Sequence, residues 1–92
     1  MIAVYHNKNF LDSKYQFGEA VPTDEELELV AYVNTDEIET AFMLTNHIEC
    51  AWWENREVKA VKTEVRSTSV GDVCIKDNGE KLICRGIGWD KI

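Results

Sequence analysis

The sequence predicts an α+β fold in which one main helix packs on a small, mainly antiparallel sheet of three to five strands. Three observations support this prediction. Apolar residues recur at helical spacing between residues 36 and 54, short β-prone segments flank that stretch, and Asn78-Gly79 is a strong hairpin signal. With 92 residues, of which 45% are hydrophobic and one is proline, the chain is predicted to form a single domain over residues 1–92.

The first third is predicted to hold two strands joined by a long loop. Residues 2–5 are short, apolar and β-prone, and residues 27–33 alternate between the two faces of a strand. Residues 7–22 between them are mostly polar, and we expect an ordered loop held to the body by its large side chains. Those side chains are Phe10, Leu11, Tyr15 and Phe17.

A helix is predicted over residues 36–54. Asp36 and Glu39 have the spacing of a capping box, and acidic residues suit the positive N-terminal end of a helix. At 100 degrees per residue, one stripe of the helix is apolar and is expected to face the core. Its members are Ile38, Ala41, Phe42, Thr45, Ile48, Trp52 and Trp53. The opposite, exposed face is predicted to carry Asp36, Glu39, Met43, His47, Cys50 and Glu54.

The last third is predicted to complete the sheet. Residues 58–66 have the pattern of a half-buried strand, and residues 67–71 that of a turn or bulge. Residues 72–76 and 81–86 are predicted as a hairpin, and residues 87–92 could extend the sheet.

The three cysteines are predicted to be free thiols. Their number is odd and no C-x-x-C pair is present, which favours a reducing compartment. A two-residue turn at Asn78-Gly79 would place Cys74 opposite Ile83, so Cys74 and Cys84 would not face each other.

Charge is sorted along the chain. The net charge is -7, but residues 19–57 contain eleven acids and one base, and the remainder contains six acids and nine bases. Affinity for phosphate backbones comes mainly from lysine and arginine, so this balance argues against direct nucleic-acid binding. The acidic segment could attract a basic partner, or it could simply be a solvated face.

Membrane insertion and secretion are not expected. The sequence has no run of 18 apolar residues and no signal-peptide pattern, so a cytoplasmic location without a membrane partner is predicted.

Patterns for catalysis and metal binding are weak. His47 and Cys50 are three residues apart on the predicted helix, but they project away from the hairpin that holds the other two cysteines. No G-x-S-x-G motif accompanies either histidine, and a domain this small offers little room for a cleft with paired carboxylates. We therefore predict no enzymatic activity, no catalytic residue, no metal and no cofactor.

Two sets of residues remain as candidate binding sites. The first is the exposed helix face, which could bind a basic protein surface or imitate the phosphates of a nucleic acid; its residues are Asp36, Glu39, Met43, His47 and Glu54. The second is an anion site in the turn after residue 65, where an arginine, hydroxyl groups and backbone N–H groups could hold a phosphate. Its residues are Arg66, Ser67, Thr68 and Ser69. The hydroxyl groups of the last three could instead form hydrogen bonds with the local backbone.

The segment from Val65 to Ile92 also resembles a known family. The sequence is R-S-T-S-V-G-D-V at residues 66–73, D-N-G at 77–79 and G-I-G-W at 86–89. These motifs resemble the YodL-like domain of small uncharacterised bacteriophage proteins, which has no catalytic residues to carry over. The resemblance implies a phage accessory protein that binds a host or phage protein, as inhibitors of CRISPR or restriction systems do. A small-molecule or nucleotide-binding module and a structural, oligomer-forming phage component remain as alternatives.

Overall fold

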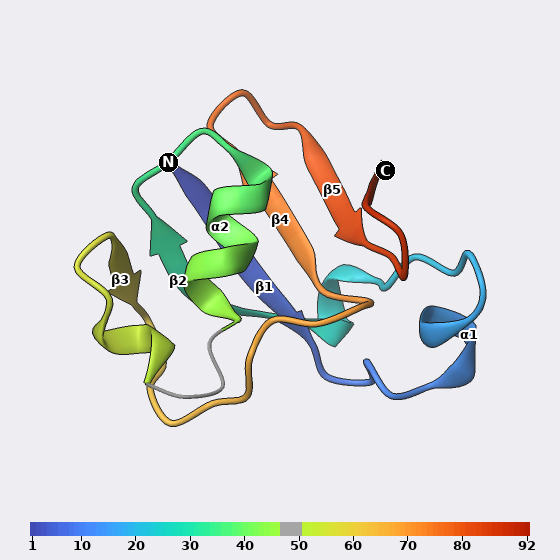
Figure 1. Cartoon of the computed structure of the whole chain (residues 1–92). Coiled ribbons are helices and arrows are strands. Elements are labelled where there is room, and N and C mark those ends of the chain that lie inside the picture. Colours follow the sequence, from blue (N-terminus) through green and yellow to red (C-terminus); the bar gives the residue numbers. More distant parts are fainter. Residues whose placement is uncertain (47–50) are drawn as a thin grey trace.

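The N-terminal strand lies in the middle of the sheet. In the computed structural model, which describes residues 1–46 and 51–92, β1 (Ile2–Asn7) pairs with β2 (Leu27–Val33) on one side and β4 (Val73–Lys76) on the other (Figure 1). Outside these lie β3 (Val58–Ala60), next to β2, and β5 (Lys81–Cys84), next to β4. The sixth strand, β6 (Trp89–Lys91), pairs with β5. The order is β3-β2-β1-β4-β5-β6, and every neighbouring pair is antiparallel.

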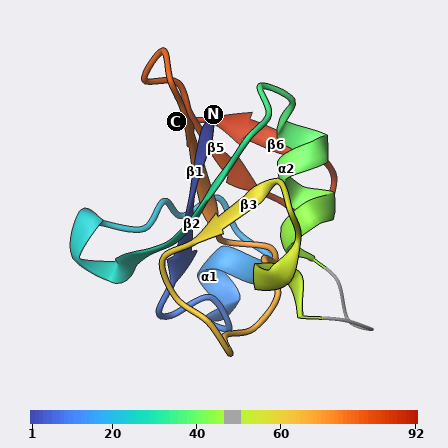
Figure 2. The ribbon, with the colours of Figure 1, turned by 90° about the vertical axis from the view of Figure 1, so that its left-hand side faces the viewer.

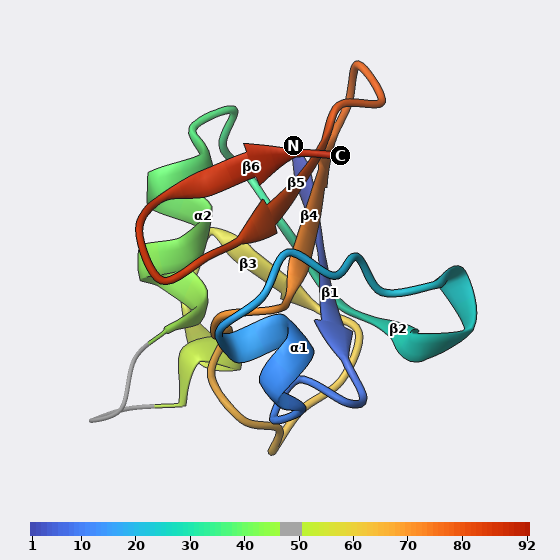
Figure 3. The ribbon, with the colours of Figure 1, turned by 90° about the vertical axis from the view of Figure 1, so that its right-hand side faces the viewer.

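The helical elements are short. The longest in the described part of the chain is α2 (Ile38–Thr45), which packs against one face of the sheet. The others are α1 (Ser13–Gln16) and two 3₁₀ turns, η1 (Asp24–Glu26) and η2 (Trp52–Glu54). Figures 2 and 3 show that α2 and η1 lie on opposite sides of the sheet. None of the helices that the structure describes is long and apolar enough to cross a membrane.

The predicted fold class is therefore wrong. The described residues form a mostly β structure with a six-stranded antiparallel sheet, whereas we expected one main helix on three to five strands. The difference comes from β6, which adds a sixth strand, and from α2, which is shorter than the predicted helix. Only residues 58–60 of the predicted strand 58–66 pair with β2, and the C-terminal segment pairs as β6.

The predicted helix over residues 36–54 is too long, because α2 ends at Thr45. Side-chain hydrogen bonds join the end of α2 to segments that lie further along the chain. Asn55 Nδ2 donates to the Leu44 carbonyl at 2.8 Å, and the Asn46 amide donates to the Thr68 carbonyl. Trp52 is buried as predicted, but it lies in η2, and its indole N–H donates to the Arg66 carbonyl at 3.1 Å.

The predicted capping box is also wrong. The N-cap of α2 is Glu37, which makes no side-chain cap hydrogen bond, and the Asp36 carboxylate instead binds the amino group of Met1 at 3.1 Å. A capping box does occur at η1, where Thr23 N donates to Glu26 Oε1 at 3.1 Å.

The main core lies between the sheet and α2. Its fully buried side chains come from the three central strands, α2 and η2: Ile2, Val4, Val30, Ala31, Val33, Ala41, Trp52 and Cys74. A β-bulge between Val4 and Tyr5 leaves Val30 as an extra residue in β2. The bulge explains why Val30 and Ala31 are both buried, although strict alternation would place them on opposite faces.

The β4–β5 hairpin is where predicted, but its register is shifted by one residue. Val73 pairs with Ile83 and Cys74 with Leu82, and Lys76 N donates to the Glu80 carbonyl at 2.9 Å. The loop thus has three residues and ends at Gly79, whose φ of 87° lies in the left-handed region. Cys74 and Cys84 are buried free thiols.

The long loop is held in place by two of the four predicted side chains, Tyr15 and Phe10, whose ring centroid lies 3.5 Å from Arg66 Cζ. Tyr15 on α1 is buried and donates a hydrogen bond to Glu26 at 2.8 Å. Leu11 is 75% exposed and Phe17 is 92% exposed, so the prediction that these two side chains anchor the loop is wrong.

Candidate protein-binding surface

The residues of the predicted acidic face do not share one helix. Glu39 and Met43 are exposed one turn apart on α2, but Asp36 precedes the helix and Glu54 lies in η2. His47 lies outside the described residues. Only Glu39 and Met43 therefore form a common surface on α2.

Glu39 borders a hollow between α2 and the turn that joins β5 to β6. The hollow has a volume of about 250 Å³ and is lined by Glu39, Phe42, Val70, Cys84, Arg85, Gly86, Gly88 and Trp89. The rings of Phe42 and Trp89 pack edge to face, with centroids 5.9 Å apart. This contact joins the helix to the edge strand and gives the hollow an aromatic wall.

The turn beside the hollow presents an isoleucine to solvent. Arg85 N donates to the Gly88 carbonyl at 3.0 Å, and Gly88 has a φ of 70°, which favours glycine. Ile87, between the two glycines, is 96% exposed. We did not predict this residue, although an isoleucine within a G-x-G turn is a visible signal of an exposed apolar side chain.

The base of this turn is fixed by Arg85. Its guanidinium donates to the carbonyls of Glu19 and Ala20 at 3.1 Å each, and its Nε lies 3.3 Å from the Asp90 carboxylate. Ile87 is therefore held at a defined position by backbone and side-chain contacts below it.

The predicted anion site is organised around a buried carboxylate. Asp72 is 0% exposed and binds the Arg66 guanidinium through both oxygens, at 2.6 and 2.7 Å. The backbone N–H groups of Ser69 and Asn7 each donate to it at 2.8 Å. The carboxylate thus holds the turn of residues 66–72 against the end of β1.

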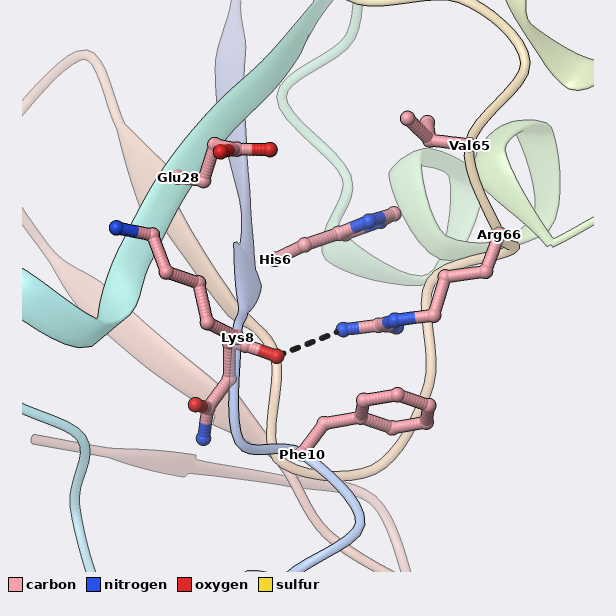
Figure 4. Close-up of a pocket in the computed structure, with 7 residues that line it drawn as sticks. His6, Lys8, Phe10, Glu28, Val65 and Arg66 are labelled. Carbon is pink, nitrogen blue, oxygen red and sulfur yellow. Dashed lines mark hydrogen bonds between the residues drawn. The ribbon is translucent and has the colours of Figure 1, made fainter.

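Arg66 also contacts the first loop. Its Nη2 donates to the Asn7 carbonyl at 3.0 Å, and the Phe10 ring centroid lies 3.5 Å from its Cζ (Figure 4). These residues line a pocket of about 240 Å³ together with His6, Lys8, Glu28 and Val65. Such a volume is smaller than most pockets for drug-sized ligands.

His6 stands at the back of this pocket as a neutral side chain. Its Nε2 forms a hydrogen bond of 3.0 Å with Thr68 Oγ1, and burial lowers the pKa of His6 from 6.5 to about 4. Asp72 opposes this shift in pKa but does not cancel it.

The four residues of the predicted anion site have different surroundings. Arg66 binds Asp72, Thr68 is buried against His6, the Ser69 N–H donates to Asp72, and the Ser67 carbonyl accepts from Arg66. An external anion would have to compete with the Asp72 carboxylate for Arg66, so anion binding here stays a prediction.

The described residues contain neither a cluster of metal ligands nor an activated thiol. No group of three or more His, Cys, Asp or Glu side chains is arranged there to hold a metal ion. Burial raises the pKa of Cys74, and it raises the pKa of Cys84 to about 12, which disfavours the reactive thiolates. His47 and Cys50, considered above as metal ligands, lie outside the described residues.

Comparison with known proteins leaves the family open. No family model, curated protein or solved structure matches the chain. The resemblance to the YodL-like domain is therefore still a prediction.

Proposed function

We propose that this protein acts by non-covalent protein binding through the surface formed by α2 and the β5–β6 turn. The observation that carries the proposal is Ile87, which is 96% exposed beside an aromatic-walled hollow. Isolated exposed aliphatic residues are common, but one on a hydrogen-bonded turn next to a concave surface offers both a projection and a recess to a partner.

The charge of this surface indicates the chemistry of the partner. Glu39 lines the hollow, and Glu37 is exposed near the start of α2. Asp36 and Asp90 are also exposed, where they pair with the amino group of Met1 and with Arg85. A protein with basic residues around an apolar side chain would complement both the acidic rim and the hollow. Burying Ile87 in such a contact would contribute about 1.5–3 kcal/mol.

The resemblance to bacteriophage proteins extends this proposal. In that setting the partner is a host or phage protein in the bacterial cytoplasm, and binding inhibits a host factor such as a CRISPR or restriction enzyme. The exposed carboxylates would then occupy a groove that normally holds phosphates. The proposed action requires no catalytic residue or cofactor.

Affinity capture from a bacterial lysate, followed by mass spectrometry, tests the proposal. The wild type is compared with Ile87→Ser and Glu39→Lys, which alter the proposed surface. Glu54→Lys is the matched control, because it makes the same charge change in η2 on an exposed residue that does not line the hollow.

A specific partner should be retained by the wild type and by Glu54→Lys. Its affinity, measured with purified proteins by calorimetry, should fall at least tenfold with Ile87→Ser. If Glu39→Lys and Glu54→Lys lowered the affinity for the partner equally, binding would depend on the overall negative charge of the protein and not on the proposed surface.

A further inference from the structure

The face of the sheet opposite α2 carries a row of side chains that ends in lysine on both sides. The strand register aligns Lys59, Tyr32, Ala3, Ile75 and Lys81 across β3, β2, β1, β4 and β5. With neighbouring strands about 4.8 Å apart, the two lysine backbones are roughly 19 Å from each other.

Part of this face is uncovered by the described chain. The next row contains Leu29 and Tyr5, which are half-buried, followed by Val73 and Ile83, which are fully buried. In Figures 2 and 3, η1 and its neighbouring segment project from this side of the sheet, and no ribbon of the described residues lies over the end of β1 near the N-terminus. Tyr5, Leu29 and Tyr32 thus form a partly accessible aromatic and aliphatic platform.

A hollow adjoins the platform. Its volume is about 430 Å³, and it is lined by Val21, Pro22, Asp24, Leu27, Val73, Gly79, Lys81 and Ile92. Val21 and Ile92 are among the exposed large apolar residues of the chain. The hollow is mostly aliphatic, so it suits an apolar side chain.

The two lysines of the row are exposed and have no acidic partner in the described part of the chain. Neither makes an ion pair or a side-chain hydrogen bond in the part of the chain that the structure describes. Five of the other eight basic residues form ion pairs: Lys62 with Glu28, Lys76 and Lys91 with Glu80, Arg66 with Asp72, and Arg85 with Asp90. Lys8, Lys14 and Arg56 form none among the described residues, but they are not part of this row. In a chain with seventeen acidic residues, two unpaired lysines that flank an apolar platform favour an anionic partner.

We propose that this face binds an acidic, apolar polypeptide segment. Apolar side chains of the segment would pack on Tyr5, Leu29 and Tyr32 and enter the hollow, while its carboxylates would pair with Lys59 and Lys81. A polypeptide is favoured over single-stranded nucleic acid because the hollow is mostly aliphatic and suits an apolar side chain, whereas nucleic acid is bound mainly by stacking on aromatic rings and by basic grooves. This surface lies on the opposite side of the sheet from the one proposed above, so the protein would bridge two partners.

Selection from a display library of random 12-residue peptides tests the inference. The immobilised wild type should enrich peptides with acidic residues on both sides of an apolar one. The double variant Lys59→Glu/Lys81→Glu should lose these peptides, with at least a tenfold drop in affinity for a synthesised consensus peptide. The control Lys62→Glu/Lys91→Glu makes the same change in net charge outside the row and should bind the peptide normally.

Three results would overturn the inference. They are the absence of any enriched peptide, an acidic consensus that the row variant retains, and tighter binding of a labelled single-stranded 12-mer DNA than of the consensus peptide. Circular dichroism establishes that each variant is folded. Because Ile87→Ser leaves this face intact, it should not alter peptide binding, so the inference and the proposed function can fail independently.

Discussion

Asp72 has the largest set of contacts among the buried charged residues described above. It joins the end of β1, the turn of residues 66–72 and the Arg66 guanidinium through hydrogen bonds of 2.6–2.8 Å. A buried carboxylate is stable only when its oxygens are paired, and both oxygens of Asp72 are. The motif around Arg66 is therefore a structural unit as well as a candidate site.

Substitution of Asp72 should destabilise the protein. In Asp72→Asn the Arg66 guanidinium loses its anionic partner, which should lower the free energy of unfolding by about 3 kcal/mol in urea denaturation at pH 7. We place the value at the low end for broken buried pairs because the Arg66 side chain remains 27% exposed.

Asp77→Asn is the control for Asp72→Asn. It removes a carboxylate that pairs with the amino group of Met1 at the surface, so it should change stability little. Equal denaturation midpoints for the two variants would contradict a structural role of Asp72.

His6 should make stability depend on pH in a defined window. Its pKa is lowered from 6.5 to about 4, so between these values the unfolded chain binds a proton that the native chain does not. Stability should fall as the pH drops from 6.5 towards 4, by up to about 3 kcal/mol.

The variant His6→Gln isolates this effect, because glutamine can bind Thr68 but does not titrate. Urea denaturation at several pH values should show a shallower slope for His6→Gln between pH 6.5 and 4. Parallel curves would show that His6 does not cause the pH dependence. Glu26, whose pKa hydrogen bonds lower to about 2, contributes only as the pH falls below about 4.5.

Residue types predicted part of the site but not its centre. Arg66 and its hydroxyl neighbours are a recognisable anion pattern, and Glu39 and Met43 are exposed as expected. Asp72 was not predicted, because an aspartate next to glycine is usually a solvated turn residue, and only the fold brings β1 close enough to bury it. The sequence did not predict the row from Lys59 to Lys81 for a similar reason, since the alignment of these lysines depends on pairing across five strands.

At the scale of elements, local patterns predicted the strands better than the helix. The segments 27–33, the hairpin position and the C-terminal strand were correct because alternation and turn residues act over a few neighbours. The helix was overestimated because Asn46, Asn55 and Trp52 form hydrogen bonds with distant carbonyls that no periodicity contains.

The glycine at the end of the hairpin loop should be required for stability. Gly79 has a φ of 87° with no atom within 4 Å of an added Cβ, so Gly79→Ala should cost about 1 kcal/mol through backbone strain alone. Thermal unfolding should shift down by about 4–8 °C.

Gly86→Ala is the matched control, because Gly86 is equally open but its φ lies outside the left-handed region. It should leave the melting temperature unchanged or raise it slightly. If both variants lowered the melting temperature by a similar amount, the positive φ of Gly79 would not be the cause of the loss in stability.

At the scale of the whole molecule, the sheet separates two surfaces of opposite character. The α2 side presents Glu39 and Ile87, and the other side presents the tyrosines between Lys59 and Lys81.

Burial of the thiols gives a readout of global unfolding. In the native protein at pH 8, Cys84 should react with iodoacetamide about a thousandfold more slowly than an unperturbed thiol, because its pKa is raised to about 12. Cys74 should be protected in the same way, and both should react at once in denaturant. Mass spectrometry of peptides identifies each site, and rapid native labelling of Cys74 would show that β4 opens locally.

The central position of β1 has a consequence for synthesis on the ribosome. Its two partners are separated by about forty residues of sequence, so the edge that will pair with β4 stays open until residue 76 has left the exit tunnel. Until then the nascent chain offers an unpaired, apolar strand edge, which is a common starting point for aggregation. Chains stalled or truncated before residue 73 should therefore depend on chaperones far more than the complete chain does.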